Sequence, residues 1–194
     1  MVARSDAKNA IIDATMELIQ ESGGNVEDLT IRAIAERSNV GVGLINYHFQ
    51  TKDHLIEIAV QRIIGDVISS FKPNLNPDLS SLEQLKNVVK SVADFLAAEP
   101  SVSKVSILGD YKTPKMFDNT MQTVKGFGLS LRNENIPDKN KILLMFTLTS
   151  VLQAIFLRRD LSAELFGHDF NDKSQRDELI DLIIGHLTWE GAHE

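Results

Sequence analysis

Apolar residues recur every three or four positions along most of the chain, which is the spacing of one buried face of an α-helix. The first such stripe runs from Ile11 to Ile19 and predicts a helix over about residues 6–21. The pair Gly23-Gly24 is expected to end it, because glycine is a poor helix former and adopts turn conformations easily. Strand-like alternation is short and lies inside longer helical periods, so the pattern favours an all-α protein.

Two short helical segments follow the first helix. One begins at Thr30, whose hydroxyl can accept a hydrogen bond from a free backbone N–H of the first turn, and ends near Ser38-Asn39. Asn39 suits a tight turn because asparagine tolerates the left-handed conformation. The next segment covers about residues 42–47. Two short helices joined by such a turn form a helix-turn-helix, whose second helix enters the DNA major groove.

A fourth helix is predicted over residues 51–71, and a segment rich in proline and asparagine at 72–78 is the best candidate for a domain boundary. Longer apolar helices follow it, predicted over residues 81–98, 102–108, 114–133, 138–159 and 173–189. We therefore expect an all-α fold of about nine helices. A three-helix DNA-binding domain at 1–50 and a connecting helix at 51–71 precede a larger ligand-binding and dimerisation domain at 72–194.

The predicted reading helix has distinct inner and outer positions. Val40 and Ile45 are apolar and are expected to hold it on the core, and Ala35 is small where the two helices cross. The positions left to face outward are Val42, Gly43, Leu44, Asn46 and Tyr47. Gly43 lets the helix lie close to DNA, Val42 or Leu44 can pack on a thymine methyl group, and Asn46 can bond an adenine edge or a phosphate.

Residues 29–55 resemble the signature of the TetR/AcrR family of regulators. The most specific part is Tyr47-His48-Phe49 followed by Thr51-Lys52-Asp53 and Leu55. The resemblance covers roughly residues 5–70, and beyond them the chain is similar only in its length and helical pattern. It implies a DNA-binding regulator whose C-terminal helices bind a ligand and form a dimer.

The resemblance also implies roles by position. Thr30 and the backbone amide of Lys52 stand at helix N-termini that contact phosphate, and the Lys52 side chain adds a charged contact. Tyr47 and His48 stand where the family places aromatic phosphate ligands. Arg32 stands where some members read a guanine.

Two positions depart from the family pattern, and one keeps it. Asn46 stands where an aromatic residue is frequent, and Gly41 stands where a serine often caps the reading helix. Phe49 keeps its place as a core residue between the third and fourth helices.

The net charge is −7, and both parts of the chain are acidic. Bulk charge therefore argues against non-specific coating of nucleic acid. A DNA site needs a local basic face, for which the candidates are Arg4, Lys8, Arg32, Lys52 and His48. Binding through such a face is expected to depend strongly on salt, because the dependence follows the phosphates contacted and not the net charge.

Several classes of protein are disfavoured. No cysteine and no apolar N-terminal leader are present, and the longest uncharged run, Ile142–Leu157, is 16 residues, below the roughly 20 that span a membrane. We expect a cytoplasmic protein without a membrane segment. Histidines lack metal-ligand spacing and no catalytic set stands out, so we expect neither an enzyme nor a metal or cofactor.

The predicted helices at 138–159 and 173–189 are apolar on more than one face. Such helices can face the core on one side and a second subunit on another, which predicts a four-helix interface of a homodimer. The alternative, that both close the core of a monomer, stays open at this point.

An effector site is expected among the middle helices, with apolar walls and a few polar groups. The candidates are Phe95, Leu108, Tyr111, Phe117, Met121, Phe127, Met145, Thr149, Gln153 and Phe156. Because none of them is charged, the predicted effector is small and hydrophobic.

The sequence thus predicts a ligand-responsive repressor that a hydrophobic effector releases from a pseudo-palindromic DNA operator. The alternative is a helical small-molecule binding protein whose DNA-reading head no longer functions. Footprinting on DNA distinguishes the two.

Overall fold

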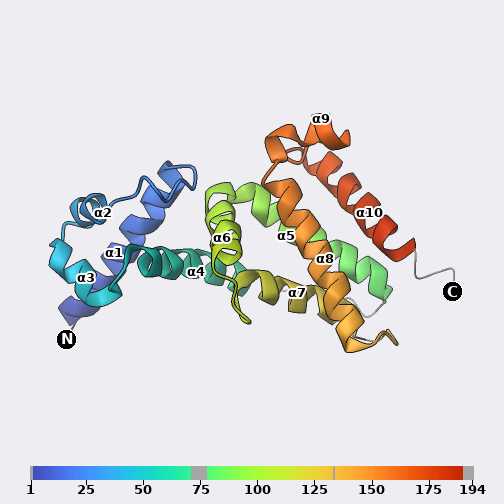
Figure 1. Cartoon of the computed structure of the whole chain (residues 1–194), viewed down its shortest axis with the longest axis horizontal. Helices are drawn as coiled ribbons and strands as arrows, with labels where there is room; N and C mark the ends of the chain where they lie inside the picture. The colour runs from blue at the N-terminus through green and yellow to red at the C-terminus, as the bar shows by residue number, and fades with distance from the viewer. Residues whose placement is uncertain (1, 71–77, 133, 190–194) are drawn as a thin grey trace. The chain divides into compact units, whose positions relative to one another are not determined.

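The computed structural model describes residues 2–70, 78–132 and 134–189 (Figure 1). These residues form ten α-helices and one short 3-10 helix, with no strand among them, so the predicted all-α class is confirmed. Contacts divide the chain into two compact units. The first comprises residues 1–72 together with Pro100–Lys112, and the second comprises 73–99 together with 113–194.

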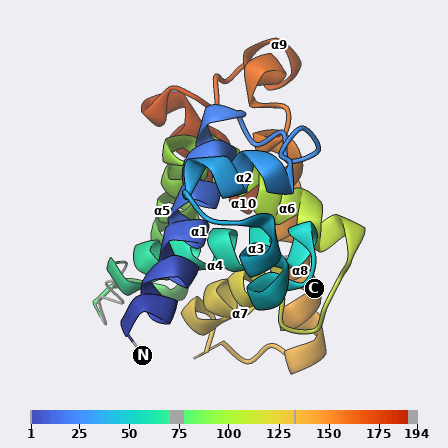
Figure 2. The same cartoon turned by 90° about the vertical axis from the view of Figure 1, so that its left-hand side faces the viewer.

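The first unit contains α1 (Val2–Glu21), α2 (Ile31–Arg37), α3 (Val42–Phe49), α4 (Lys52–Ser70) and α6 (Pro100–Lys112). Helix α1 packs against each of the other four, and α6 packs against α1 and α4. Figure 2 shows α2 and α3 together in this unit. Fully buried Ile11, Ile34, Phe49 and Leu55 join α1 to α4 in one core, which also includes Val102 of α6.

Helix α6 differs from its prediction in both length and packing. We expected a helix over 102–108 within the C-terminal domain, and the structure has a longer helix whose Val102 and Val105 are buried in the N-terminal core. The helix begins at Pro100 because proline is tolerated in a first turn, where its missing N–H would have no helical partner.

Two turns of the first unit end helices in the same way. After α1, Gly23 has φ +60 and the Gly24 N–H donates to the Ile19 carbonyl at 3.0 Å. After α2, Asn39 has φ +53 and the Val40 N–H donates to the Ala35 carbonyl at 3.0 Å. Each is a Schellman ending, in which a left-handed residue lets the chain satisfy carbonyls of the last turn.

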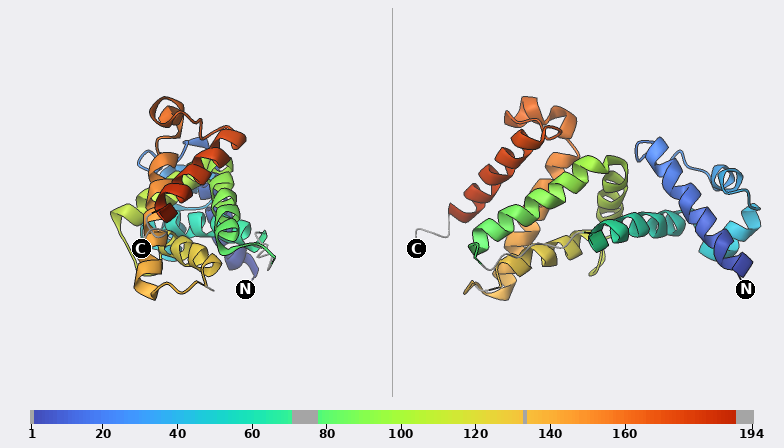
Figure 3. Two further views of the ribbon diagram at one scale, coloured as in Figure 1. Left: turned by 90° about the vertical axis from the view of Figure 1, so that its right-hand side faces the viewer. Right: turned by 180° about the vertical axis from the view of Figure 1, so that it is seen from behind.

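The second unit contains α5 (Ser81–Ala98), α7 (Asn119–Ser130), α8 (Asp138–Phe156), α9 (Ser162–Phe166) and α10 (Lys173–Trp189), with the 3-10 helix η1 (Arg159–Leu161) before α9. Helix α5 packs against α7, α8 and α10, and α8 packs against α7 and α10. Figure 3 shows α5 and α10 running alongside each other. The predicted bounds of α5 and α10 are confirmed.

Helix α7 begins later than predicted because of an aspartate. We expected a helix from residue 114, but Asp118 caps it: one carboxylate oxygen accepts the N–H of Met121 at 2.9 Å and the other accepts that of Lys115 at 2.9 Å. A side chain that satisfies N–H groups on both sides of the boundary favours a helix start at that place.

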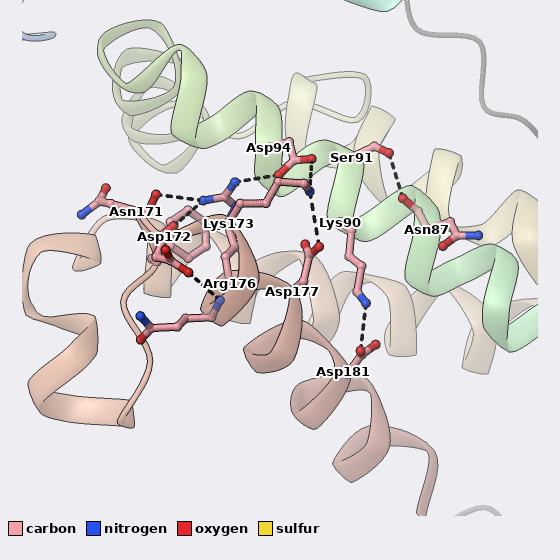
Figure 4. A network of polar contacts seen from close by, with 12 residues as sticks. Asn87, Lys90, Ser91, Asp94, Asn171, Asp172, Lys173, Arg176, Asp177 and Asp181 are labelled. Carbon is pink, nitrogen blue, oxygen red and sulfur yellow. Dashed lines mark hydrogen bonds and ion pairs between the residues drawn. The ribbon is translucent and has the colours of Figure 1, made fainter.

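A network of charges holds α10 on α5 (Figure 4). Arg176 is buried and donates to the carboxylate of Asp94 at 2.7 Å and to the Phe170 carbonyl at 2.7 Å. Lys173 donates to the other oxygen of Asp94 at 2.8 Å. Burial raises the pKa of Asp94, but the hydrogen bonds from Arg176 and Lys173 outweigh it and hold that pKa below its ordinary value.

Among the described residues, no single helix is both long and apolar enough to cross a membrane. Only the strongly bent pair formed by α8 with the η1–α9 segment meets the length and composition limits jointly.

Candidate nucleic-acid interface

Helices α2 and α3 form the predicted helix-turn-helix. The Thr30 hydroxyl caps α2 by accepting the N–H of Ala33 at 3.1 Å, as expected. Asn39 supplies the left-handed turn between the helices. Helix α3 begins after Gly41, which makes no side-chain cap. Local signals of a few residues thus account for the start of α2 and for the turn that follows it.

The inner face of α3 is the one predicted. Ile45 and Phe49, four positions apart and therefore one helical turn apart, are both fully buried. Ala35 of α2 is buried with them, and Val40 is half-buried against the same core. This packing orients α3, so the face opposite Ile45 and Phe49 points away from the core.

Gly43, Asn46 and Tyr47 are exposed on this outer face, and Val42 is exposed at the start of the helix, three positions before Ile45. Tyr47 has 67 % of its surface accessible and Val42 has 41 %, so both side chains are exposed to solvent. Leu44, which we also expected to face outward, is half-buried on the flank of the helix.

His48 lies one helical turn after Leu44, on the same flank of α3. It is half-buried between its neighbours, with ring centroids 5.1 Å from Tyr47 and 6.0 Å from Phe49. Its Nε2 atom is buried and has no hydrogen-bond partner. The His48 ring is therefore partly packed within the first unit, whereas we had expected it to point outward as a phosphate ligand.

The Lys52 side chain is placed differently from its prediction. Its ammonium donates to the carbonyls of Val26 at 3.0 Å, Glu27 at 3.4 Å and Leu29 at 2.9 Å. An ammonium has three N–H donors, so all of them have partners within the protein. The side chain ties the loop before α2 to the first turn of α4, where we had expected a contact to phosphate.

Arginines on α2 have different surroundings. Arg32 is exposed. Arg37 contacts Glu21 at 2.8 Å and Glu17 at 3.1 Å, which raises the pKa of Arg37 and lowers that of Glu21. The sequence pattern did not predict this α1–α2 contact, because Arg37 stands 16 and 20 positions from its two partners. Of the five expected basic residues, only Lys8 and Arg32 have exposed side chains, and the Arg4 side chain lies outside the described residues.

The predicted effector residues do not gather around one hollow. Phe127, Met145, Thr149, Gln153 and Phe156 are buried in the second unit. Phe95 and Met121 are half-buried there, and Phe117 is 75 % exposed. Leu108 and Tyr111 are exposed on α6, which packs with the first unit. Of the two described hollows, one is an open groove lined by α8 and α10, including Leu143, and the other is an open groove lined by α10, including Leu182.

Exposed apolar side chains mark one surface of α8 and α10. On α8 these are Ile142, Leu143 and Phe146, and on α10 the residue is Leu182. An exposed apolar surface of this kind is typical of a contact with another chain. The location agrees with the helices from which we predicted a homodimer.

Residues 11–59 match the family described as bacterial regulatory proteins, tetR family. An uncharacterized HTH-type transcriptional regulator of Haemophilus influenzae is 25 % identical over 123 residues, 63 % of this chain and 64 % of that protein. The HTH-type transcriptional repressor KstR of Rhodococcus jostii is 30 % identical over 104 residues, 53 % of this chain and 46 % of that protein. The alignments thus span less than two thirds of these relatives.

Solved structures share the fold over nearly the whole chain. Mycobacterium smegmatis BioQ has a TM-score of 0.68 at 17 % identity, covering 94 % of this chain and 97 % of that one. FadR from Bacillus subtilis, solved in complex with stearoyl-CoA, has a TM-score of 0.61 at 16 % identity, covering 92 % and 96 %. Residues 11–59 thus carry the helix-turn-helix domain of the tetR family of bacterial regulatory proteins, and the chain as a whole shares the fold of these solved regulators.

Proposed function

We propose that this protein is a dimeric, ligand-responsive DNA-binding regulator that represses transcription until a small hydrophobic effector releases it. The observation that carries the proposal is the exposed outer face of α3, which buried Ile45 and Phe49 hold away from the core. That is how a helix-turn-helix presents its second helix to the major groove.

We assign the phosphate contacts to residues that flank the outer face of α3. Thr30 and the backbone N–H of Lys52 stand at the starts of α2 and α4, where free N–H groups favour an anion. Tyr47 and His48 extend the contact beside α3, and Arg32 is the exposed guanidinium available on α2. Phosphate contacts position the protein, and the residues on the outer face of α3 supply the sequence preference.

The apolar surface of α8 and α10 supports a homodimer. Two copies meeting through these helices bury Ile142, Leu143, Phe146 and Leu182, which would otherwise remain in water. A two-fold dimer presents two α3 helices. Spacing of about 34 Å between them fits successive major grooves on one face of DNA and requires a pseudo-palindromic operator.

The effector site is proposed in the apolar interior of the second unit. Gln153 donates to the Thr120 hydroxyl at 3.0 Å, and its Oε1 atom is buried with no hydrogen-bond partner. Phe127, Met145 and Phe156 are buried in the same unit. A mainly hydrophobic effector with one hydrogen-bond donor suits this chemistry.

Selection of bound sequences from a random duplex library, repeated at two salt concentrations, tests the DNA-binding part. We expect a motif with two-fold symmetry whose half-sites lie one or more helical turns apart. Failure of folded protein to enrich any motif, also after unfolding and refolding without ligand, contradicts a regulator and favours the small-molecule binding protein with an inactive head.

The selected duplex then tests the response to an effector. Small hydrophobic compounds are screened for release of the protein from it, with an effect of about 1–3 kcal/mol expected for an allosteric coupling. A screen in which only highly charged compounds act contradicts a hydrophobic effector.

A further inference from the structure

The composition of the outer face of α3 limits which bases it can read. Helix α3 contains neither arginine nor lysine, and its outward residues are Val42, Gly43, Asn46 and Tyr47. In the major groove, guanine is most often read by arginine or lysine, adenine by asparagine or glutamine, and the thymine methyl by apolar side chains. The exposed chemistry of α3 therefore matches adenine and thymine and lacks the usual partner of guanine.

Nearby cations do not change this match. The Lys52 ammonium donates all its hydrogens to backbone carbonyls, and Arg37 is paired with Glu17 and Glu21. His48 is half-buried on the flank of α3. Arg32 is exposed but stands on α2, so any guanine that it reads lies at a different position from the bases under α3.

Gly43 adds an independent observation. It lies inside α3 with no positive φ, and a Cβ built on it meets nothing within 4 Å. Neither backbone conformation nor packing within this chain requires glycine there, and glycine disfavours a helix relative to alanine. Other helical glycines, such as Gly65, also have open space, but Gly43 lies on the exposed face of the predicted reading helix, where the lack of a side chain leaves room for a base edge to approach the backbone.

We propose that the part of the operator half-site beneath α3 consists of A·T base pairs. Thymine methyl groups pack against Val42, an adenine edge bonds with Asn46, and the base edges approach the backbone at Gly43. The inference rests on the proposed function, since it concerns the sequence that the same head reads. The proposal assigns the base specificity of α3 to the side chains of Val42 and Asn46 and to the absence of a side chain at Gly43.

Library selection with variants tests the base composition. Positions whose preference relaxes in Val42→Ala or Asn46→Ala are those read by α3, and we expect A·T pairs there. Enrichment of G·C pairs at those positions overturns the inference while leaving the regulator intact. Absence of any enriched motif instead contradicts the proposed function.

Modified duplexes test the individual contacts. Replacing a contacted thymine by uracil removes only its methyl group and is expected to weaken binding about fourfold. The loss should shrink in Val42→Ala, because the shorter side chain buries less of the methyl group. Replacing the contacted adenine by 7-deazaadenine should weaken the natural protein and leave Asn46→Ala unchanged. If a modified duplex weakens DNA binding of the natural protein and of the matching variant equally, the assigned contact between that base and that side chain is overturned.

Gly43→Ala separates a DNA contact from a structural role. Alanine should raise the melting temperature of the protein, because it favours a helix more than glycine does. It should nevertheless lower DNA affinity, because its methyl group would occupy the space that the base edges need. Gly65→Ala is the matched control: Gly65 lies in α4 of the same unit and a Cβ there also meets nothing within 4 Å. It should raise stability with DNA affinity unchanged. Unchanged affinity in both variants overturns the close approach at Gly43.

Discussion

Gly24 lies so close to Ser101 that a Cβ built on the glycine would stand 2.7 Å from the Ser101 carbonyl oxygen. Gly24 also has φ +77, which side-chain-bearing residues rarely adopt. The loop after α1 is thus fitted against the first turn of α6. Beside it, the Lys104 ammonium donates to the Asn25 side-chain oxygen at 2.9 Å, so this contact joins α6 to the N-terminal unit.

Gly24→Ala is expected to destabilise the N-terminal unit by about 2–3 kcal/mol, because the backbone strain and the steric contact add. Chemical unfolding of the full chain measures the change. Gly23→Ala is the matched control, since Gly23 has φ +60 but open space around its Cβ position, and it should cost only about 1 kcal/mol. Equal losses of unfolding free energy in the two variants would show that the backbone at Ser101 moves aside easily and that the close contact adds no destabilisation.

Arg176→Met is expected to lower the free energy of unfolding of the second unit by about 1–3 kcal/mol. The substitution keeps most of the buried volume but leaves the Phe170 carbonyl without this donor and removes one partner from Asp94. Thermal or urea unfolding measures it. Lys173→Met is the control, because Lys173 is 63 % exposed and an exposed ion pair contributes less than about 1 kcal/mol. A loss as small as that of the control would contradict an anchoring role for Arg176.

Acid should weaken the same unit through Asp94. Its pKa in the folded protein lies below the ordinary value, so its stabilising contribution is present above the unfolded-state pKa of about 3.9 and is lost as the pH falls through the folded-state pKa. We therefore expect Asp94→Asn to be less stable than the natural protein at pH 7, with the difference shrinking toward pH 3. Unfolding curves at both pH values check this, and a difference that grows in acid would have the wrong sign.

Lys52→Met should destabilise the head by about 1–3 kcal/mol, since three backbone carbonyls lose the same donor. The salt dependence of DNA binding should keep its slope. A side chain that contacted phosphate would instead reduce the slope by about one unit on loss of its charge. Titrations at several salt concentrations therefore decide between the internal role seen here and the phosphate contact expected from the sequence.

Arg32→Ala should relax the preference at one base pair of each half-site and cost about 1–3 kcal/mol on the best site. Repeating the library selection with the variant measures this. Arg37→Ala provides the comparison on the same helix: it loses the contacts with Glu17 and Glu21 and should lower stability without changing base preference. Uniform weakening on all sequences by Arg32→Ala would place that side chain on phosphate.

The local structure of the head was predictable because its signals lie within a few residues of each other. The apolar period placed α1 to α4, the Thr30 hydroxyl capped α2, and Asn39 formed the left-handed turn, as expected. Ile45 and Phe49 are buried because a helix repeats its faces every three to four residues. The same period indicated the outer face of α3, except for Leu44, which lies at the boundary between the faces.

Contacts between distant segments were decided only by the tertiary structure. Arg176 and Asp94 stand 82 positions apart, and Lys52 stands 23 to 26 positions from the carbonyls that it binds. A periodic pattern shows that a side chain is on a polar or apolar face, but it does not say which other element meets that face. For that reason the sequence alone determined helices α1 to α4 and most of the exposed face of α3, whereas the packing of α6 with the N-terminal core and the role of the Lys52 ammonium followed from three-dimensional proximity.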